Sequence, residues 1–249
     1  MRLLLHQFRG EQKLFWRSRE LAFFTFLLPI IFFLILASAY GDEEIEGTDG
    51  YLYLLSGMIG YGAIATTFAG LALLLVIRRE SGVLKRLRST PLPGWAYIAS
   101  VLGSILFVFF LEAVALVLLA RLAFDVEIPG NLFSLVLVLA LGAAAFAALG
   151  VGLTAVIRSA EGSSAVVNAV YLPLTFISGS FFSADAFPTV LRAIAEVLPL
   201  VHFIALVRNV MLLDDQIWDH PTDVAIVAAW GAVGAIVALR GFRWEPRER

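Results

Sequence analysis

Six long apolar runs divide this chain, and they constrain its fold more than any motif does. A hydrocarbon core about 30 Å thick takes roughly 20 helical residues to cross, and the runs approach or exceed that length. The strands of a membrane β-barrel would instead alternate apolar and polar residues. The sequence therefore predicts an all-α integral membrane protein with six transmembrane helices. The expected spans lie near Leu21–Tyr40, Tyr51–Ile77, Ala96–Ala120, Leu132–Ile157, Ser164–Ser180 and Thr222–Leu239.

The composition agrees with a membrane protein. Of the 249 residues, 60% are hydrophobic and 15% are charged, a balance that a soluble domain of this size would rarely tolerate without aggregating. Between the runs there is no linker long enough for a soluble module. We therefore expect residues 1–249 to form a single transmembrane domain.

The basic residues predict the orientation of the chain. With the N-terminus placed in the cytosol, all but three of the 18 Lys and Arg residues fall on the cytosolic side, the exceptions being Arg121, Arg192 and Arg208. The opposite side begins instead with an acidic run between Asp42 and Asp49. By the positive-inside rule we expect a multi-pass protein of the inner (plasma) membrane with both termini cytosolic. This charge distribution gives no support to nucleic-acid binding.

The segment 1–20 has the pattern of an amphipathic helix. At about 100° per residue its apolar side chains share one arc and its basic side chains share the next. We expect an interfacial helix on the cytosolic leaflet, the alternative being an ordinary basic flank of the first span. The apolar arc holds Leu4, Leu5, Phe8, Phe15 and Trp16, and the basic arc holds Arg2, His6, Arg9, Lys13 and Arg17.

The segment 181–213 is too apolar for a free loop, yet prolines and charges interrupt it. We expect two short helices, the first ended by Pro199 and the second beginning at Val201. An outer-leaflet re-entrant hairpin fits this pattern better than the alternative of two complete spans, because each helix is short and charged.

No enzymatic site is evident in the sequence. A nucleotide-binding P-loop needs Gly-Lys-Ser/Thr, but the only lysines, Lys13 and Lys85, follow Gln12 and Leu84. Cysteine is absent, and the three histidines lack the spacing of a zinc site. We expect a chain that is not an enzyme and holds no cofactor or metal of its own.

Few polar side chains lie inside the predicted spans, where burial without a partner is costly. Thr66 and Thr67 lie in the second span, Glu112 in the third and Asn168 in the fifth. We place all four near a substrate path. Structural hydrogen bonding between helices remains the alternative for each of them.

Two motifs give the chain a resemblance to a known family. The first is the basic loop Arg79-Glu80-Ser81-Gly82-Val83-Leu84-Lys85-Arg86-Leu87 followed by Thr90-Pro91. The second is the outer run Ser178-Gly179, Phe182, Pro188, Leu191-Arg192 and Leu198-Pro199-Leu200. Together with the order of spans, they resemble the permease subunits of type-2 ABC transporters, which export drugs, lipids and polysaccharides and have the type V exporter fold. One departure is Ser183-Ala184-Asp185, where relatives often carry a proline.

The resemblance implies a dimer of six-span subunits, formed with a second copy or a close paralogue, in which the first, second and fifth spans line the interface. It implies a separate ABC ATPase subunit that binds ATP and Mg. The cytosolic loop 78–93 would then be a coupling helix seated in that ATPase, and the outer motif would be a gate. The implied coupling residues are Glu80, Gly82, Val83, Leu84, Lys85, Arg86 and Leu87, and the implied gate residues are Ser178, Gly179, Phe182, Pro188 and Pro199.

The residues of the loop suggest how it would dock. Val83, Leu84 and Leu87 can present an apolar ridge, while Lys85 and Arg86 can meet acidic groups or lipid phosphates. The alternative is that these cations only set the topology.

The substrate is the least determined property. Abundant Phe in the spans favours an amphiphilic drug or lipid, and a polysaccharide, which would favour Tyr and Trp stacking, is the alternative. A secondary carrier that uses Glu112 and an inert membrane scaffold remain as other classes.

Overall fold

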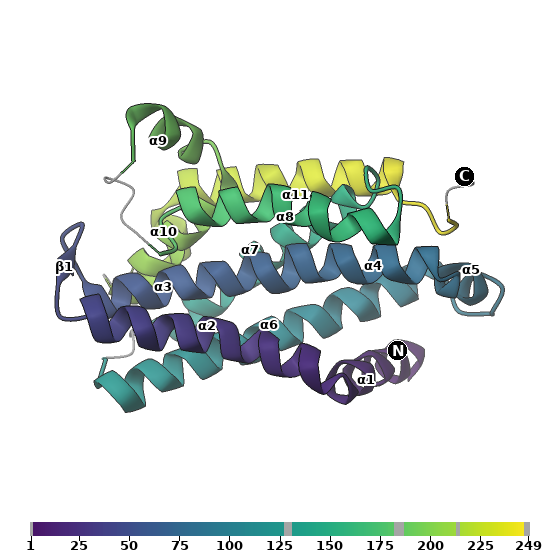
Figure 1. Cartoon of the computed structure of the whole chain (residues 1–249), viewed down its shortest axis with the longest axis horizontal. Helices are drawn as coiled ribbons and strands as arrows, with labels where there is room; N and C mark the ends of the chain where they lie inside the picture. The colour runs from purple at the N-terminus through teal and green to yellow at the C-terminus, as the bar shows by residue number, and fades with distance from the viewer. Residues whose placement is uncertain (1, 127–130, 182–186, 213–214, 247–249) are drawn as a thin grey trace.

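The computed structural model describes residues 2–126, 131–181, 187–212 and 215–246. The described chain is almost entirely helical, and its long helices run side by side as a bundle (Figure 1). Its elements are α1 (Arg2–Arg17), α2 (Arg19–Tyr40), β1 (Glu44–Ile45), β2 (Thr48–Asp49), α3 (Gly50–Gly62), the π-helix η1 (Ala63–Gly70), α4 (Leu71–Glu80), α5 (Val83–Arg88), α6 (Gly94–Phe124), α7 (Leu132–Leu153), α8 (Ala160–Ile177), α9 (Thr189–Ala195), α10 (Pro199–Leu212), the 3₁₀-helix η3 (Ile217–Asp219) and α11 (Pro221–Gly241).

Among the described residues, five helical stretches are long and apolar enough to cross a membrane. They are Arg19–Tyr40, Gly50–Glu80, Gly94–Phe124, Leu132–Leu153 and Pro221–Gly241. They correspond to five of the six expected spans. The sixth, expected at Ser164–Ser180, is represented by α8, a helix of 18 residues that lies along the bundle but carries more polar residues (Figure 1). An all-α membrane architecture is therefore confirmed, while a crossing by α8 stays a prediction.

The second span is the centre of the bundle. It is a continuous helical stretch from α3 through η1 to α4, and nearly every side chain of α3 is buried. The carboxylate of Asp49 accepts a hydrogen bond from the backbone N–H of Leu52 and caps the start of this stretch. The π-helical middle, Ala63–Gly70, was not predicted, since an apolar run does not indicate how tightly a helix winds.

Small residues bring α7 and α11 close together. A Cβ atom at Gly234 would meet backbone atoms of Ala148 and Leu149, and one at Gly231 would lie 3.0 Å from the Cα of Ala145. Without a hydrophobic driving force in lipid, close backbone approach of this kind is a principal source of attraction between membrane helices. This contact holds α11, which is the last of the expected spans, against the core of the bundle.

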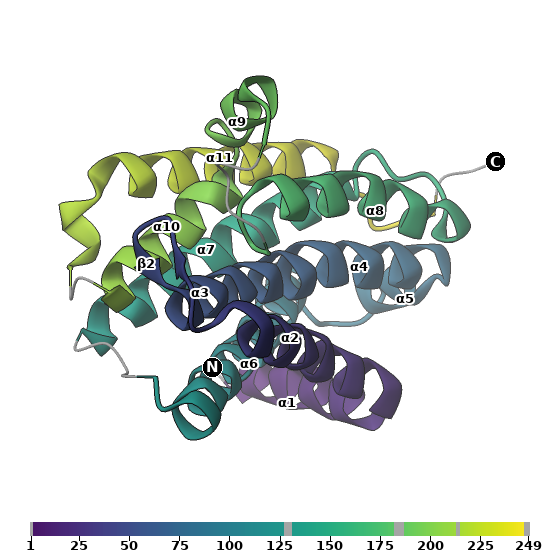
Figure 2. The same cartoon turned by 60° about the vertical axis from the view of Figure 1, so that its left-hand side comes forward.

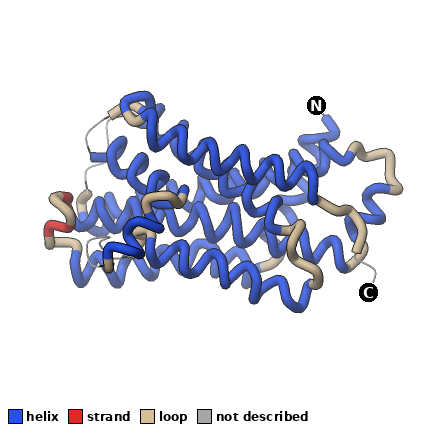
Figure 3. Tube along the Cα trace, turned by 90° about the horizontal axis from the view of Figure 1, so that it is seen from above, coloured by secondary structure: helices blue, strands red, loops and turns tan. Residues whose placement is uncertain are grey.

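The two ends of the bundle differ. One end holds α5 and both chain termini, as Figures 1 and 3 show from two directions. The other end holds the β1–β2 hairpin, in which Glu44 pairs with Asp49 and Ile45 with Thr48. This distribution matches the two groups of loops expected from the basic residues, and the cytosolic position of the end that carries α5 stays a prediction.

Two helices lie between α8 and α11, joined by a bend of 77°. The helix α9 stands apart from the bundle above α11 (Figure 2). The expectation that Pro199 ends the first helix is wrong. That helix ends at Ala195, and Pro199 is the first residue of α10, a position that suits proline because its missing N–H would be unpaired there. The pair has the composition of one bent span or of a re-entrant hairpin, so the re-entrant path stays a prediction.

Candidate functional site

The predicted coupling loop forms a short helix, α5, at one end of the bundle. Gly82 has a φ of +73°, which glycine adopts without steric cost and which lets the chain turn sharply from α4 into α5. The hydroxyl groups of Ser89 and Thr90 donate to the carbonyls of Arg86 and Leu87 and close the helix. Pro93 then immediately precedes α6.

The side chains of α5 divide between the bundle and the solvent. Leu84 is fully buried in a cluster with Tyr97 and residues of α4, and Leu87 packs against the same cluster. Val83, Lys85 and Arg86 are exposed. The residues of the expected apolar ridge therefore do not share one surface. Leu84 faces its own chain and holds α5 in place, and the surface that α5 exposes is mainly cationic.

Arg79 ties the base of α5 to a distant part of the chain. Its side chain is 2% exposed and donates hydrogen bonds of 2.9 Å and 2.7 Å to the carbonyls of Thr154 and Ile157, which lie in the turn between α7 and α8. It also pairs with Glu80 at 2.9 Å. The guanidinium thus satisfies two buried backbone carbonyls of the turn that follows α7.

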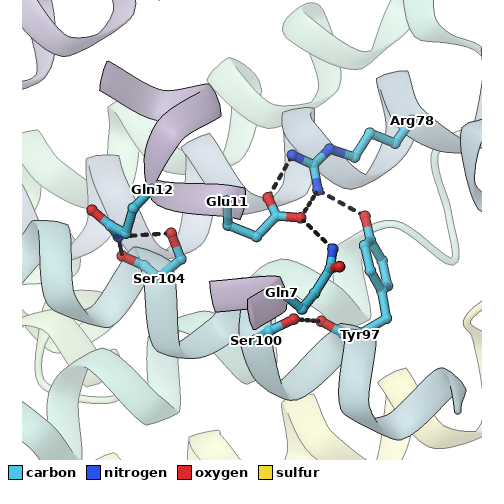
Figure 4. A network of polar contacts seen from close by, with 7 residues as sticks. All are labelled: Gln7, Glu11, Gln12, Arg78, Tyr97, Ser100 and Ser104. Carbon is cyan, nitrogen blue, oxygen red and sulfur yellow. Dashed lines mark hydrogen bonds and ion pairs between the residues drawn. The ribbon is translucent and has the colours of Figure 1, made fainter. Parts of the chain in front are cut away.

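Arg78, the preceding residue, reaches in a different direction. It forms a two-pronged ion pair with Glu11 of α1, with distances of 2.7 Å and 3.0 Å, and donates to the Tyr97 hydroxyl at 2.7 Å. Figure 4 shows the Glu11 carboxylate enclosed by Arg78 on one side and Gln7 on another. Consecutive arginines therefore join the end of α4 to α1 and to the α7–α8 turn.

The contact of α1 with the bundle extends beyond this ion pair. The amide of Gln12 donates to both the hydroxyl and the carbonyl of Ser104, and Phe8 packs edge-on against Phe107 with centroids 5.9 Å apart. Part of the arc expected to face lipid thus packs on α6. Glu11 was not predicted as a functional residue, although it is the one acid within α1 and has Gln7 and Gln12 nearby, which was an available signal.

The four residues expected along a substrate path do not all meet. Thr66 lies in the π-helix, and its hydroxyl donates to the carboxylate of Glu112 at 2.8 Å. Thr67 is buried and bonds to the carbonyl of Ala63 in its own helix. Asn168 is exposed on α8 and bonds to Ser164. The structure therefore brings together Thr66 and Glu112, and leaves the other two elsewhere.

A cavity of about 480 Å³ connects these two polar centres. Thr66 and Glu112 line it near the middle of the second and third spans, and Glu11 and Arg78 line it near the end that carries α5. The first half of α2 covers it, including Pro29, whose missing N–H leaves the carbonyl of Thr25 without a helical donor. The remaining walls are mostly aliphatic and aromatic, so the cavity has the size and character of a small-molecule site.

The predicted gate residues lie at the opposite end. Ser178 and Gly179 form the turn after α8, where Gly179 has a φ of +77° and Ser178 donates to the carbonyl of Thr175. Pro188 immediately precedes α9 and is exposed, whereas Pro199 is the first residue of α10 and is buried. Phe182 lies outside the described residues.

Comparison with known proteins places most of the chain in one class. Residues 3–212 match the family described as ABC-2 type transporter. A Bacillus subtilis (strain 168) protein with the name "Putative transport permease YvfS" is 22% identical over 204 residues, which cover 82% of this chain and 83% of that protein. Nodulation protein J of Rhizobium leguminosarum bv. trifolii is 40% identical over 75 residues, which cover 30% of this chain and 29% of that protein.

Proposed function

The chain belongs to the ABC-2 type transporter family, and on this premise we propose that it is the membrane-spanning subunit of an ATP-driven exporter in the bacterial inner membrane. The family consists of transport permeases and implies an ABC ATPase as partner. The sequence contains no Gly-Lys-Ser/Thr motif, so we assign the binding of ATP and Mg to that partner.

The observation that carries the proposal is the exposed cationic surface of α5 on a rigid base. Lys85 and Arg86 project from a helix whose inner side is fixed by the buried Leu84. We propose that these cations meet acidic groups of the ATPase, and that closure of two ATPase subunits displaces α5. Because Arg78 and Arg79 join the base of α5 to α1 and to the α7–α8 turn, such a displacement would reach both.

A second copy of the chain, or a close paralogue, would complete the transport path. The helix α8 presents an exposed face that includes Val166, Asn168, Val170 and Phe176. We propose that this face meets the second subunit, with Asn168 at the interface, Thr66 and Glu112 on the cavity side, and Thr67 as support for the π-helix. The turn at Ser178 and Gly179, with Phe182 and the hairpin that begins at Pro188, would form the outer gate.

For the substrate, we propose an amphiphilic drug or a lipid. The walls of the cavity are mostly apolar, which suits an amphiphile better than a polysaccharide. A polysaccharide exporter would carry its substrate along a different, more polar path.

The proposal is tested by reconstitution with a candidate ABC ATPase in proteoliposomes. Vanadate-sensitive ATP hydrolysis should depend on this chain, and reversing the charges of Lys85 and Arg86 to Glu should abolish ATPase binding. The matched control reverses Arg240 and Arg243, two exposed cations, the first in the last turn of α11 and the second just after that helix, and it should leave binding unchanged.

Two results would contradict the proposal. Unchanged ATPase binding after reversal at Lys85 and Arg86 would exclude α5 as the docking surface. Transport that continues without ATP and stops with Glu112→Gln would instead identify a secondary carrier.

A further inference from the structure

The Glu112 carboxylate, which lines the cavity beneath α2, has unused capacity to accept hydrogen bonds. Glu112 is 2% exposed, and in the described part of the chain its carboxylate accepts one hydrogen bond, from Thr66, and forms no ion pair. An ionised carboxylate offers about four acceptor sites. Its free acceptor capacity therefore remains for a group inside the cavity that it lines.

The charges that line the cavity are unbalanced. Among the described lining residues, Arg78 is the one Lys or Arg, and it is already paired with Glu11 at 2.7 Å. Glu112 is therefore the acid without a counter-charge, near the middle of two spans, where an unpaired carboxylate is costly. A ligand with a single positive charge would complement this site.

The rest of the cavity suits an alkyl chain. Between the two polar centres the walls are formed by Leu14, Leu21, Leu28, Leu74, Ile105 and Val108. Thr66 and Arg78 are twelve residues apart on one helical stretch, which at 1.5 Å per residue corresponds to roughly 18 Å. A ligand with its head at Glu112 would thus have a long apolar channel for its tail.

We propose that the cavity beneath α2 binds an amphiphile with an ammonium head, received by Glu112 and Thr66, and an alkyl tail that lies between α2 and α6. The statement that such an amphiphile is the transported substrate rests on the proposed export function. The ammonium group donates to the Glu112 oxygens, Thr66 continues to donate to the same carboxylate, and Gly62 allows Glu112 to pack against the backbone of α3.

The test measures binding of radiolabelled dodecylamine by equilibrium dialysis. The purified chain is held in phosphatidylcholine nanodiscs, without any ATPase, and empty nanodiscs are subtracted. We expect one saturable site per chain, with dodecylamine bound at least about tenfold more tightly than dodecanol or dodecyl sulfate, because a charge-assisted hydrogen bond is involved. Equal binding of the amine and the alcohol would overturn the proposal without the use of any variant.

Variants then locate the site. Glu112→Gln keeps the size of the side chain and an acceptor for Thr66, and it should remove the preference for the amine while dodecanol binding stays the same. Leu28→Trp should fill the cavity and abolish binding of both. The control is Asp125→Asn, which changes the acid that follows the last residue of α6 and whose side chain is 94% exposed, and it should have no effect. An amine preference that survives both Glu112→Gln and Leu28→Trp would overturn the assignment.

The natural amine could be a membrane lipid or a foreign compound. Phosphatidylethanolamine in the nanodiscs should compete with dodecylamine if a lipid amine occupies the site, whereas phosphatidylglycerol should not. Lack of competition by either lipid, with amine binding intact, identifies a non-lipid amine. A chain that stimulates an ABC ATPase but shows no amine preference would overturn this inference and leave the proposed function standing.

Discussion

Replacing Arg79 by Met is expected to destabilise the end of the bundle that carries α5. The change keeps most of the apolar stem but leaves the carbonyls of Thr154 and Ile157 without their donors in a buried setting. Each unsatisfied buried group costs about 1–3 kcal/mol, so the two together should lower the free energy of unfolding by about 2–6 kcal/mol. Arg79→Lys should fall between the wild type and Arg79→Met, because a single ammonium cannot reproduce the planar fork.

The measurement is reversible unfolding in mixed micelles, combined with hydrogen exchange of the backbone between Thr154 and Ile157. Exchange in that turn should become faster in Arg79→Met. The matched control is Arg86→Met, an exposed arginine in the adjacent helix, where the change in unfolding free energy should stay within about 0.5 kcal/mol. Equal stability of the two variants would refute the inference that Arg79 fastens α4 to the α7–α8 turn.

Two further predictions concern the same end of the molecule. Glu11→Gln and Arg78→Met should each destabilise the chain by about 3–5 kcal/mol, because each leaves the other charge buried without a counter-ion. In a double-mutant cycle of unfolding free energies, the double variant should lose much less stability than the sum of the two single variants. Additive losses would argue against a coupled pair. Gly82→Ala should lower the free energy of unfolding by about 1–2 kcal/mol through its positive φ alone, since nothing lies within 4 Å of the added Cβ. The control Ser81→Ala, measured in the same unfolding assay, should be near neutral. Equal effects of the two substitutions would show that the turn tolerates a side chain at Gly82.

The positions of the spans could be predicted from the sequence because hydropathy is a property of each segment by itself. The run near Ala96–Ala120, for example, lies within Gly94–Phe124. The π-helix could not be predicted in this way, since mean hydropathy carries no information about how a helix winds, and the hydrogen bond from Thr66 to Glu112 joins residues 46 positions apart. The first residue of α10 was misplaced for a different reason, because proline is compatible with both the end and the start of a helix.

The site was only partly predictable because its key contacts join segments that are distant in sequence. Arg78 and Arg79 were counted as part of the positive charge that sets topology, and nothing local indicates that one reaches Glu11 and the other Thr154. Similarly, the amphipathic pattern of α1 indicates an apolar face, but not whether that face meets lipid or, as Phe8 does, another helix.

The π-helical segment Ala63–Gly70 and the paired arginines of α4 together fix the rotational phase of the second span. If the segment rewound as an α-helix, the residues after it would point in different directions, which would carry Arg78 and Arg79 away from their partners. The contacts of Arg78 and Arg79 therefore constrain the winding of the π-helix, although the two arginines lie more than one helical turn after it. Loss of both sets of contacts would remove this constraint on the winding of the segment in which Thr66 bonds to Glu112.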